Sequence, residues 1–369
     1  MKKIIFVNDT AATMCGAVTI LKEFIKNITK NLDNNYIFYI FCSIDLKEFE
    51  TENIHIVNNI KAKKWIDRIK WDIFGMKFWA KKNSINPDLI ISLQNTGIMS
   101  FKNVPKMTYI HQAIPYNKEI KWNILNKEEQ RYIFYKYIYK CLIGITTVKN
   151  IIIVQCNWMK KEVIKAHKFN PKDVYVIEPK LNLKKFKQQN NNKFLSEDNE
   201  LKLLYPAGYT KYKNHKILIE ALNEIKKIKP NIKFKLYLTI EKDTNKEFFE
   251  KIKELNMEKE VVFLGNVKFE SLVDFYKNCN IVLFPSYLET VGLPLLEAAY
   301  FGKYIIVSDI QYARNALKNY TGVTYCKHNN FKEWSKAIIN NENSKRIYEF
   351  KNNRKDDANI IKLIKISTN

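Results

Sequence analysis

The sequence predicts an α/β protein with two doubly wound domains, each built on a parallel sheet. Three observations lead to this fold class. Short runs of β-branched and aromatic residues alternate with longer helix-like stretches, which is typical of βαβ units with right-handed crossovers. The alternation stops at a polar segment near the middle of the chain and then starts again. A chain of 369 residues is also long enough for two hydrophobic cores.

The first half of the chain contains six predicted strands. They are nearly all apolar, as expected for strands of a parallel sheet that is covered on both faces. Residues 18–30, 62–82 and 127–142 lie between strands and are long enough for helices. We therefore predict a Rossmann-like N-terminal domain over residues 1–182. The strands are KIIFV (3–7), YIFYIF (36–41), IHIV (54–57), LIIS (89–92), MTYI (107–110) and IIIV (151–154).

A second series of five strands follows the polar run 183–200. That run contains KQQNNNK, cannot bury much apolar surface, and is the predicted hinge. The second domain covers residues 201–345, and we expect ligands in a cleft where the two domains face each other. In the tail, 346–369, the final IIKLIKI is either a helix that packs back on the first domain or a frayed end. The strands are LKLLYP (201–206), FKLYLT (234–239), VVFLG (261–265), IVLFP (281–285) and YIIVS (304–308).

The composition indicates a soluble globular protein, with 46% hydrophobic and 27% charged residues. No apolar run reaches the roughly 18 residues of a membrane span. Asn8 and Asp9 interrupt the first apolar run too early for a signal peptide. The cysteines never form CxxC, so we expect reduced cytoplasmic thiols, most of them buried, without a zinc site or a disulfide framework. They are Cys15, Cys42, Cys141, Cys156, Cys279 and Cys326.

The formal net charge of +24 favours a negatively charged partner. Nucleic acid, an anionic membrane surface and phosphorylated substrates all fit this charge. Because the lysines are spread along the whole chain, they are equally well explained as residues that fill solvated positions. The charge alone therefore selects no function.

Residues 61–82, KAKKWIDRIKWDIFGMKFWAKK, combine eight basic and two acidic residues with several aromatic ones. Such a segment could lie on an anionic membrane or stack on single-stranded nucleic acid. It could also be an amphipathic helix that covers the sheet, with its aromatic side chains inward and its lysines in water. The sequence leaves these interpretations open, and we expect a membrane partner rather than nucleic acid.

Residues 281–309, IVLFPSYLETVGLPLLEAAYFGKYIIVSD, are predicted to form a strand, a loop and a helix. The strand stops at Pro285. The helix begins at about Leu293, with Pro294 in its first turn, where a missing N–H group costs nothing. The loop therefore presents backbone N–H groups at a helix N-terminus, which suits phosphate or sugar oxygens. These groups belong to Thr290, Val291 and Gly292.

Two glutamates flank the start of this helix, eight positions apart. Glu289 lies in the loop, where a carboxylate can accept hydrogen bonds from sugar hydroxyls. Glu297 lies within the helix, where it can hold a ribose diol. Two carboxylates beside a pyrophosphate would repel it unless they bind hydroxyls and a cation lies on the phosphates.

Two more segments supply candidate residues. In YPAGYTKYKNHKILIEAL, residues 205–222, a strand ends in a glycine-containing loop and Lys213 opens an amphipathic helix. Lys213 is therefore the candidate cation. In MTYIHQAIPY, residues 107–116, His111 ends a strand and is expected to point into the mouth of the cleft.

The segment PSYLETVGLPLLEAAYFGK resembles the E-x7-E region of glycosyltransferase family 4, whose members are retaining enzymes with the GT-B fold. Val291 takes the place of the more usual aromatic residue. The resemblance implies that Glu289 binds hydroxyls of the donor sugar and that Glu297 binds the ribose. It also implies that the loop residues Thr290 to Leu293 contact the donor.

The same resemblance implies roles for the other segments. Lys213, followed by Asn214, is the cation on the donor diphosphate. Gly208 or Tyr209 stands where many members carry an arginine, which implies a weaker phosphate clamp or one made of backbone N–H groups. His111 approaches the donor sugar near the reacting centre. Gly16 is what remains of the Gly-Gly pair that relatives carry near donor phosphate or acceptor.

The resemblance implies hexosyl or related transfer from a nucleotide sugar to a glycan or lipid-linked acceptor, in bacterial capsule or lipopolysaccharide synthesis. No DxD follows a strand, so we expect no metal and no cofactor. A cytoplasmic enzyme of this kind could be peripheral on the inner face of the plasma membrane. Two alternatives stay open at this stage: a nucleotide-sugar epimerase or phosphorylase with the same fold, and a basic protein that binds membranes or polyanions.

Overall fold

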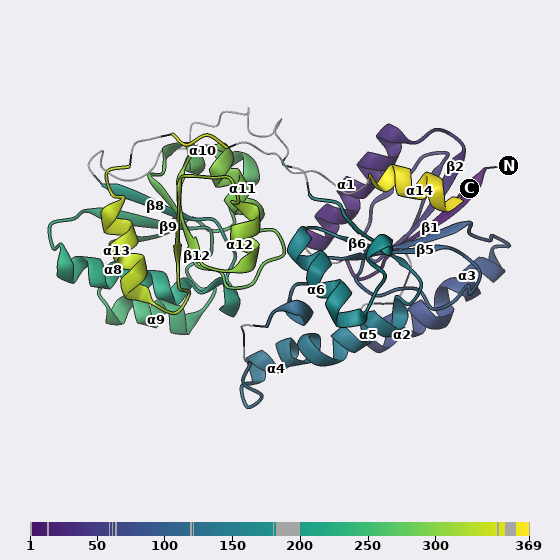
Figure 1. The fold of residues 1–369 in the computed structure, drawn as a ribbon, viewed down its shortest axis with the longest axis horizontal. Coiled ribbons are helices and arrows are strands. Elements are labelled where there is room, and N and C mark those ends of the chain that lie inside the picture. The colour runs from purple at the N-terminus through teal and green to yellow at the C-terminus, as the bar shows by residue number, and fades with distance from the viewer. Residues whose placement is uncertain are drawn as a thin grey trace. The chain divides into compact units, whose positions relative to one another are not determined.

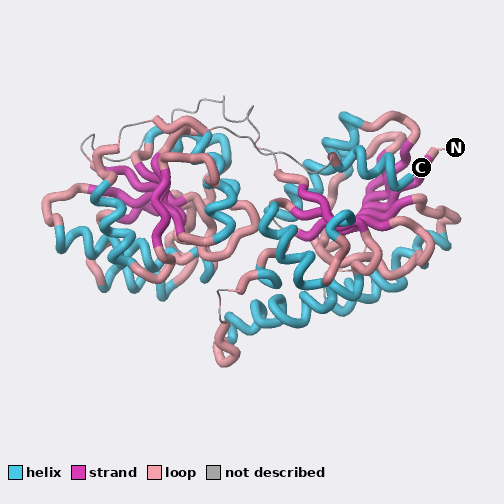
Figure 2. Tube along the Cα trace, viewed as in Figure 1, coloured by secondary structure: helices cyan, strands magenta, loops and turns pink. Residues whose placement is uncertain are grey.

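The computed structural model confirms two doubly wound α/β units. One comprises residues 1–178 with 354–369, and the other residues 179–353. In each unit the strands form one central sheet with helices on both faces (Figures 1 and 2). Of the predicted hinge, 183–200, only Glu200 lies within the described residues. The structure describes residues 2–12, 15–58, 60, 62, 65–118, 120, 122–179, 181, 200–344, 347–350 and 359–368.

The first unit contains a seven-stranded parallel sheet in the order β3-β2-β1-β4-β5-β6-β7. The six predicted strands are all present. The seventh, β7, is missing from the prediction because VYV is too short to show a periodicity of its own. The strands are β1 (Lys3–Asp9), β2 (Tyr36–Cys42), β3 (Ile54–Val57), β4 (Leu89–Ser92), β5 (Lys106–Ile110), β6 (Ile151–Val154) and β7 (Val174–Val176).

The helices predicted at 18–30, 62–82 and 127–142 are present in the first unit. The second and third each contain a π-helical turn, and Gly75 closes the first of these turns. The helices are α1 (Cys15–Asn31), η1 (Lys47–Phe49), α2 (Trp65–Lys70), η2 (Trp71–Gly75), α3 (Met76–Lys82), η3 (Ile114–Tyr116), α4 (Lys127–Phe134), η4 (Tyr135–Tyr139), α5 (Lys140–Thr146), α6 (Asn157–His167), η5 (Pro171–Asp173) and α14 (Ile360–Thr368).

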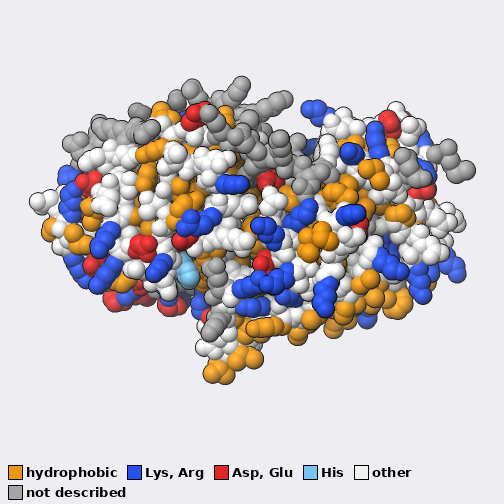
Figure 3. Space-filling model, viewed as in Figure 1, with side chains coloured by type: hydrophobic (Ala, Val, Ile, Leu, Met, Phe, Trp, Pro, Cys, Tyr) orange, Lys and Arg blue, Asp and Glu red, His pale blue; other side chains and the backbone are white. Residues whose placement is uncertain are grey.

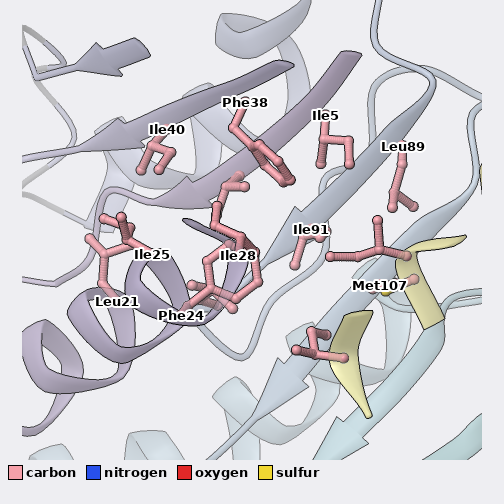
Figure 4. Close-up of a cluster of buried hydrophobic side chains, with 14 of the residues drawn as sticks. Ile5, Leu21, Phe24, Ile25, Ile28, Phe38, Ile40, Leu89, Ile91 and Met107 are labelled. Atoms are coloured by element: carbon pink, nitrogen blue, oxygen red, sulfur yellow. The ribbon is translucent and has the colours of Figure 1, made fainter. Parts of the chain in front are cut away.

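Helices α1 and α14 cover one face of this sheet (Figure 1). Leu21, Ile25 and Ile28 of α1 meet the inward side chains of β1, β2 and β4 in one buried cluster (Figure 4). Ile360, Ile361, Leu363 and Ile364 of α14 belong to the same cluster. Each such side chain stabilises the fold by about 1.5–3 kcal/mol. The C-terminal apolar stretch is therefore a helix of the first unit.

The opposite face of the sheet is covered by the helical segment α2–η2–α3. Met76 and Ala80 are buried with Phe6 and Phe41, and Trp79 packs edge-on against Phe41 with ring centroids 4.9 Å apart. The tryptophans of residues 61–82 thus point inward, as one interpretation of the sequence expected. That interpretation is wrong for two other aromatic residues of the segment, Phe74 and Phe78, which are 70% and 75% exposed.

The second unit contains a six-stranded parallel sheet in the order β10-β9-β8-β11-β12-β13. The five predicted strands are present, whereas β13 is a partly exposed edge strand without a clear apolar run. The elements are β8 (Leu201–Tyr205), η6 (Lys211–Lys213), α8 (His215–Ile228), β9 (Phe234–Leu238), α9 (Lys246–Glu254), β10 (Val261–Phe263), α10 (Phe269–Asn278), β11 (Ile281–Phe284), α11 (Leu293–Tyr300), β12 (Tyr304–Ser308), α12 (Gln311–Ala316), β13 (Val323–Cys326) and α13 (Phe331–Asn340).

Each sheet has one topological switch point, where the strand order reverses direction. It lies between β1 and β4 in the first unit and between β8 and β11 in the second. The loops after such a pair of strands leave toward opposite faces of the sheet and open a crevice at the carboxyl ends of the strands. Chemically active side chains are therefore expected just after Asp9 and Ser92, and just after Tyr205 and Phe284.

Four described cysteine side chains are buried thiols and Cys141 is an exposed thiol; among the described residues none of these five forms a disulfide. They are Cys42, Cys156, Cys279 and Cys326 besides Cys141. None of the helices in the described part of the chain is both long and apolar enough to span a bilayer.

Candidate functional site

The loops after β8 and β11 meet at the switch point of the second unit. The Tyr287 N–H group donates to the Tyr212 carbonyl at 3.0 Å, and the Ser286 hydroxyl donates to the same carbonyl at 3.3 Å. The Tyr205 hydroxyl, at the end of β8, donates to the Lys213 carbonyl at 2.6 Å. These bonds fix the backbone of both loops, so the side chains that follow are held next to each other.

Lys213 and Glu289 form an ion pair across these loops. Lys213 Nζ donates to Glu289 Oε1, and the two side chains are 18% and 17% exposed. The ammonium group also lies 5.7 Å from the centroid of the Phe284 ring, within range of a cation–π interaction. Since both charges are largely removed from water, each stabilises the other, and losing one would leave the other uncompensated. The structure thus brings together the cation and the first carboxylate that the sequence predicted.

The start of α11 supplies backbone donors beside this pair. Gly292 has φ +72°, and a Cβ atom there would lie 3.2 Å from Leu295 Cδ1 and 3.3 Å from Tyr312 Cε2, so this position requires glycine. Val291 is buried, at 3% exposure. For the N–H groups of Val291 and Gly292, no hydrogen-bond acceptor is found within the described ranges. Donors of this kind at a helix N-terminus favour an anion.

Residues around Lys213 hold its loop in place. Helix α8 begins at His215, not at Lys213 as predicted, because Lys211–Lys213 form a 3-10 turn. Asn214 has the left-handed conformation, φ 58°, which asparagine tolerates. Its Nδ2 donates to the His328 carbonyl at 2.7 Å. Asn214 therefore fixes the direction in which Lys213 leaves the turn.

The predicted donor contacts Gly208 and Tyr209 differ in their surroundings. A Cβ atom built on Gly208 would meet nothing within 4 Å, so the space beside this exposed residue is open. The ring of Tyr209 packs on His215 and Phe248, with centroid distances of 5.1 and 5.5 Å. In this loop the Tyr209 ring is therefore held in place, whereas the space beside the Gly208 backbone is open to a ligand.

Glu297 lies on the side of α11 that faces α10. The Tyr276 hydroxyl donates to Glu297 Oε2 at 2.8 Å. Burial raises the pKa of Glu297 to about 7, and the hydrogen bond from Tyr276 opposes that rise. Its other oxygen, Oε1, has no hydrogen-bond partner among the residues that the structure describes. Tyr276 was missed in the sequence, because no local pattern links α10 to a carboxylate on α11.

Two predicted site residues belong to the first unit. Gly16 lies in the first turn of α1. His111 follows β5, and the Asn95 Oδ1 atom accepts hydrogen bonds from the N–H groups of His111 and Gln112 at 2.7 and 2.9 Å. Burial lowers the pKa of His111 to about 4, so its imidazole is neutral at pH 7. Its Nδ1 atom is buried and has no partner in the described part of the chain.

The switch point of the first unit holds a buried acidic cluster that sequence reasoning missed. Asp72 is 5% exposed and accepts hydrogen bonds from Asn8 Nδ2 at 3.1 Å, Gln94 Nε2 at 2.9 Å and Thr96 Oγ1 at 3.1 Å. Asp9 is 1% exposed, and no described atom hydrogen-bonds to its carboxylate. Burial raises the pKa of Asp72 to about 7 and that of Asp9 to about 8.

Comparison with known proteins bears first on the second unit. Residues 186–359 match the sequence model of the family described as glycosyl transferases group 1. The O-antigen chain mannosyltransferase RfbU of Salmonella typhimurium is 34% identical over 89 residues. That similarity covers 24% of this chain and 25% of the relative, so it extends over only a quarter of the relative's length. The family match thus makes residues 186–359, most of the second unit, similar to group 1 glycosyl transferases.

Solved structures resemble the chain over nearly its whole length. Alr3699/HepE from Anabaena, in complex with UDP and glucose, has a TM-score of 0.64 at 16% identity, over 93% of this chain and 90% of its own. WaaG, a glycosyltransferase involved in lipopolysaccharide biosynthesis, has a TM-score of 0.64 at 12% identity, over 91% and 90%. At these identities the likeness shows the fold alone. It confirms the predicted GT-B architecture of two Rossmann-like domains.

Proposed function

We propose that this chain is a glycosyltransferase that moves a sugar from a nucleotide-sugar donor to a glycan or lipid-linked acceptor. The meeting of Lys213 and Glu289 at the switch point of the second unit is the observation that carries this proposal. It combines a cation for phosphates and a carboxylate for hydroxyls with helix-start N–H groups. The family match over residues 186–359 supports the same assignment.

In this proposal Lys213 exchanges one anionic partner for another. In the free chain its ammonium group pairs with Glu289. When a donor binds, the diphosphate takes over Lys213, and Glu289 is released to accept hydrogen bonds from the sugar hydroxyls. Lys213 and the N–H groups of Val291 and Gly292 then neutralise the leaving nucleoside diphosphate. Hydrogen-bond donors that are already oriented stabilise the transition state without having to move during the reaction. Each ~1.4 kcal/mol by which they lower the activation free energy increases the rate about tenfold.

Glu297 binds the ribose in this proposal, through the oxygen that Tyr276 leaves unused. Tyr276 acts on the donor only through Glu297, so it is a positioning residue. Thr290 and Leu293 flank the helix start, and Gly208 leaves room for the nucleotide beside Tyr209 and Asn214. The combination suits a ligand with hydroxyls at both ends and a diphosphate between them.

Transfer proceeds with retention of configuration and without a covalent enzyme intermediate in this proposal, as in family 4, which the E-x7-E segment resembles. The two glutamates have binding roles, so the two-carboxylate scheme of glycosidases does not apply. His111, neutral at pH 7, supports the charge that develops at the anomeric carbon. Gly16 lets the backbone of the first unit approach donor phosphate or acceptor.

The proposed setting is bacterial surface polysaccharide synthesis, with a hexosyl or related donor, no metal and no cofactor. The similarity to an O-antigen chain mannosyltransferase supports this setting. A cytoplasmic, peripheral position at the inner face of the plasma membrane would bring the enzyme to a lipid-linked acceptor. Undiminished transfer after treatment with a metal chelator is the result expected for metal independence.

The experiment that tests the proposal is a thermal-shift screen against UDP, GDP and their sugars. A ligand that binds only the folded state raises the melting temperature. We expect one nucleotide sugar to do so, and Lys213→Ala to remove the shift. Lys226→Ala is the matched control, because Lys226 forms an ion pair with Glu260 in the same unit at 2.8 Å. The proposal is wrong if no nucleotide sugar shifts the wild-type chain, or if both variants shift alike.

An epimerase or phosphorylase would pass the same binding screen. Incubation of the bound donor without acceptor separates these activities from transfer. Epimerisation of the sugar in that mixture, or phosphorolysis when inorganic phosphate is the only acceptor, would replace the proposed reaction while keeping the donor site.

A further inference from the structure

Exposed apolar side chains gather on two helical segments of the first unit, and none of them contributes to the proposed donor site. Figure 3 shows hydrophobic side chains in a row along the lower edge of this unit, over the helices labelled α4, α5, α2 and α3 in Figure 1. Soluble proteins rarely expose so many large apolar residues together without a function.

The first segment, α2–η2–α3, exposes apolar residues and lysines in turn. Ile66, Ile69, Phe74 and Phe78 are 68%, 38%, 70% and 75% exposed. The remaining exposed positions are lysines, namely Lys70, Lys77, Lys81 and Lys82. These residues recur at intervals of about three or four, so they share one face of the helix. Of the two acidic residues here, Asp72 is buried and Asp67 only partly exposed.

The second segment, α4–η4–α5 with the residues after it, repeats this pattern. Tyr137, Ile138, Ile145 and Val148 are 61%, 56%, 61% and 61% exposed. Lys127, Arg131 and Lys149 are exposed. The acidic residues of this segment are confined to positions 128 and 129 in the first turn of α4, where Glu129 is buried, and residues 130–149 contain no aspartate or glutamate. The exposed face of this segment is therefore apolar and basic as well.

Aromatic contacts join the two segments into one structure. The Trp65 ring packs edge-on against Phe134 and Tyr139, with both centroid distances 5.1 Å, and lies 6.2 Å from Tyr135. Trp65, Phe134 and Tyr139 thus fill the space between the segments, while the exposed residues given above face outward. We call the outward residues of both segments the apolar–basic face.

We propose that the apolar–basic face binds the surface of a bilayer that contains anionic lipid. Phenylalanine and isoleucine side chains of an interfacial helix enter the boundary between head groups and acyl chains, while lysines beside them pair with lipid phosphates. A nucleic-acid ligand would stack its bases on exposed rings, but much of the exposed apolar surface here is aliphatic, with Ile66, Ile138 and Ile145 56–68% exposed. Acyl chains accept aliphatic and aromatic side chains alike, whereas bases stack only on the rings. A protein partner would usually place acidic residues opposite the lysines, whereas a bilayer supplies negative charge along the whole face.

This inference rests on residues of the first unit alone and does not depend on the proposed donor site. Vesicle binding and sugar transfer are therefore measured separately, and either can fail without the other. If both hold, the face would bring the enzyme to the surface that carries a lipid-linked acceptor.

Co-sedimentation of the full chain with vesicles tests the inference. One vesicle is phosphatidylcholine alone, and the other contains about one quarter phosphatidylglycerol, near the anionic content at which basic segments bind. We expect the chain to sediment with the anionic vesicle, to bind the neutral one at least about tenfold more weakly, and to lose most of its binding in high salt. Equal binding to both vesicles, or to neither, would overturn the inference.

Variants of the face locate the binding. Phe74→Ser with Phe78→Ser should reduce the bound fraction several-fold, and so should glutamine at Lys70, Lys77, Lys81 and Lys82. The matched controls are Ile228→Ser, at a 54% exposed residue, and glutamine at four exposed lysines of the second unit, which should bind as the wild type does. Controls that lose as much binding as the face variants would contradict the assignment. The control lysines are Lys227, Lys246, Lys259 and Lys332.

Cys141 offers a direct probe, because its exposed thiol lies on the same face between Ile138 and Ile145. A polarity-sensitive fluorophore is attached there in a chain that also carries Cys15→Ser. Its emission should shift to the blue with anionic vesicles and stay unchanged with neutral ones. Sedimentation without lipid supplies the last check, because it reports whether the chain forms a dimer. If the wild-type chain is a dimer and the variant Phe74→Ser with Phe78→Ser is a monomer, the face is a contact between two copies and the membrane assignment is wrong.

Discussion

The two switch points of the molecule share a topology but differ in the burial and the pairing of their charged side chains. At β8 and β11, a lysine and a glutamate that are 18% and 17% exposed neutralise each other beside a helix start. At β1 and β4, Asp9 and Asp72 are 1% and 5% exposed, and burial raises the pKa of both carboxyls. The first arrangement keeps opposite charges ready for a ligand, whereas the second favours neutral carboxyl groups inside the protein.

This difference teaches that the carboxyl end of a parallel sheet is only a place where a site can form. Whether it binds a charged ligand depends on partial exposure and on a balanced pair of charges. In the first unit, Asn8, Gln94 and Thr96 donate hydrogen bonds to Asp72, so the Asp72 carboxyl already has partners inside the protein. Four predictions test whether the two switch points differ in this way.

The largest effect is expected at the ion pair of the second unit. Glu289→Ala and Lys213→Ala should each reduce sugar transfer by about 10³-fold, the scale on which loss of an oriented charge acts. The fold should persist, as checked by circular dichroism and melting temperature. Glu260→Ala and Lys226→Ala, which remove another ion pair of this unit, should leave transfer within about twofold of wild type. Full transfer by either site variant refutes its assigned role.

The next effect is expected at Asp72. Asp72→Ala leaves three buried donors without an acceptor and should lower the free energy of unfolding of the first unit by about 3 kcal/mol. Asp67→Ala, on the same helical segment but partly exposed, is the control and should change it by less than about 0.5 kcal/mol. Urea unfolding followed in the first unit measures both. Similar values for the two variants would mean that the buried cluster contributes nothing.

A pH-dependent effect is expected at Asp9. Its pKa is about 8 in the folded chain and about 4 in an unfolded one. The protonated side chain therefore contributes stability that is complete below about pH 4 and is lost as the pH rises through about 8.

Asp9→Asn removes this pH dependence because its side chain stays neutral. The variant should match the wild type near pH 4 and exceed its unfolding free energy by up to about 5 kcal/mol near pH 9, because each of the four units of pKa difference corresponds to ~1.4 kcal/mol. Chemical denaturation across this pH range measures the difference. A difference that is constant with pH would show that Asp9 ionises normally.

The smallest effect is expected at Glu297, whose pKa is about 7. If the carboxylate form accepts ribose hydroxyls, donor affinity should rise as the pH passes through about 7. The hydrogen bond from Tyr276 opposes the rise in this pKa, so Tyr276→Phe should move the affinity curve to higher pH and weaken binding about fivefold at pH 7. Calorimetric titration with the nucleotide sugar measures both, and Glu297→Gln should flatten the curve. A curve that stays in place in Tyr276→Phe would refute the positioning role.

Those parts of the molecule that depend on short-range pattern could be predicted from the sequence. Long apolar strands, the helix start at Leu293 and the two loops with Glu289 and Lys213 each lie within one continuous segment. Strand β7 was missed because three residues are too few to show a periodicity, and β13 because most of its residues are partly exposed and form no clear apolar run.

The residues that sequence reasoning missed act across elements. Tyr276 meets Glu297 only because α10 and α11 flank neighbouring strands. Asp72 is one of two acidic residues in the basic segment 61–82, and the sequence alone does not show which of the two is buried. The sequence also leaves open whether Phe74 and Phe78 face inward or outward: their type favours burial, and only the packing of α2–η2–α3 shows which side of the helix faces water.

A crystal structure with the nucleotide sugar found by the thermal-shift screen tests the central claim most directly. The account predicts that the diphosphate lies at the ends of β8 and β11, within hydrogen-bond reach of Lys213 Nζ and the Gly292 N–H group. Glu289 should then contact a sugar hydroxyl and no longer pair with Lys213. A diphosphate bound at the ends of β1 and β4, or a Lys213–Glu289 pair left intact beside an occupied site, would contradict it.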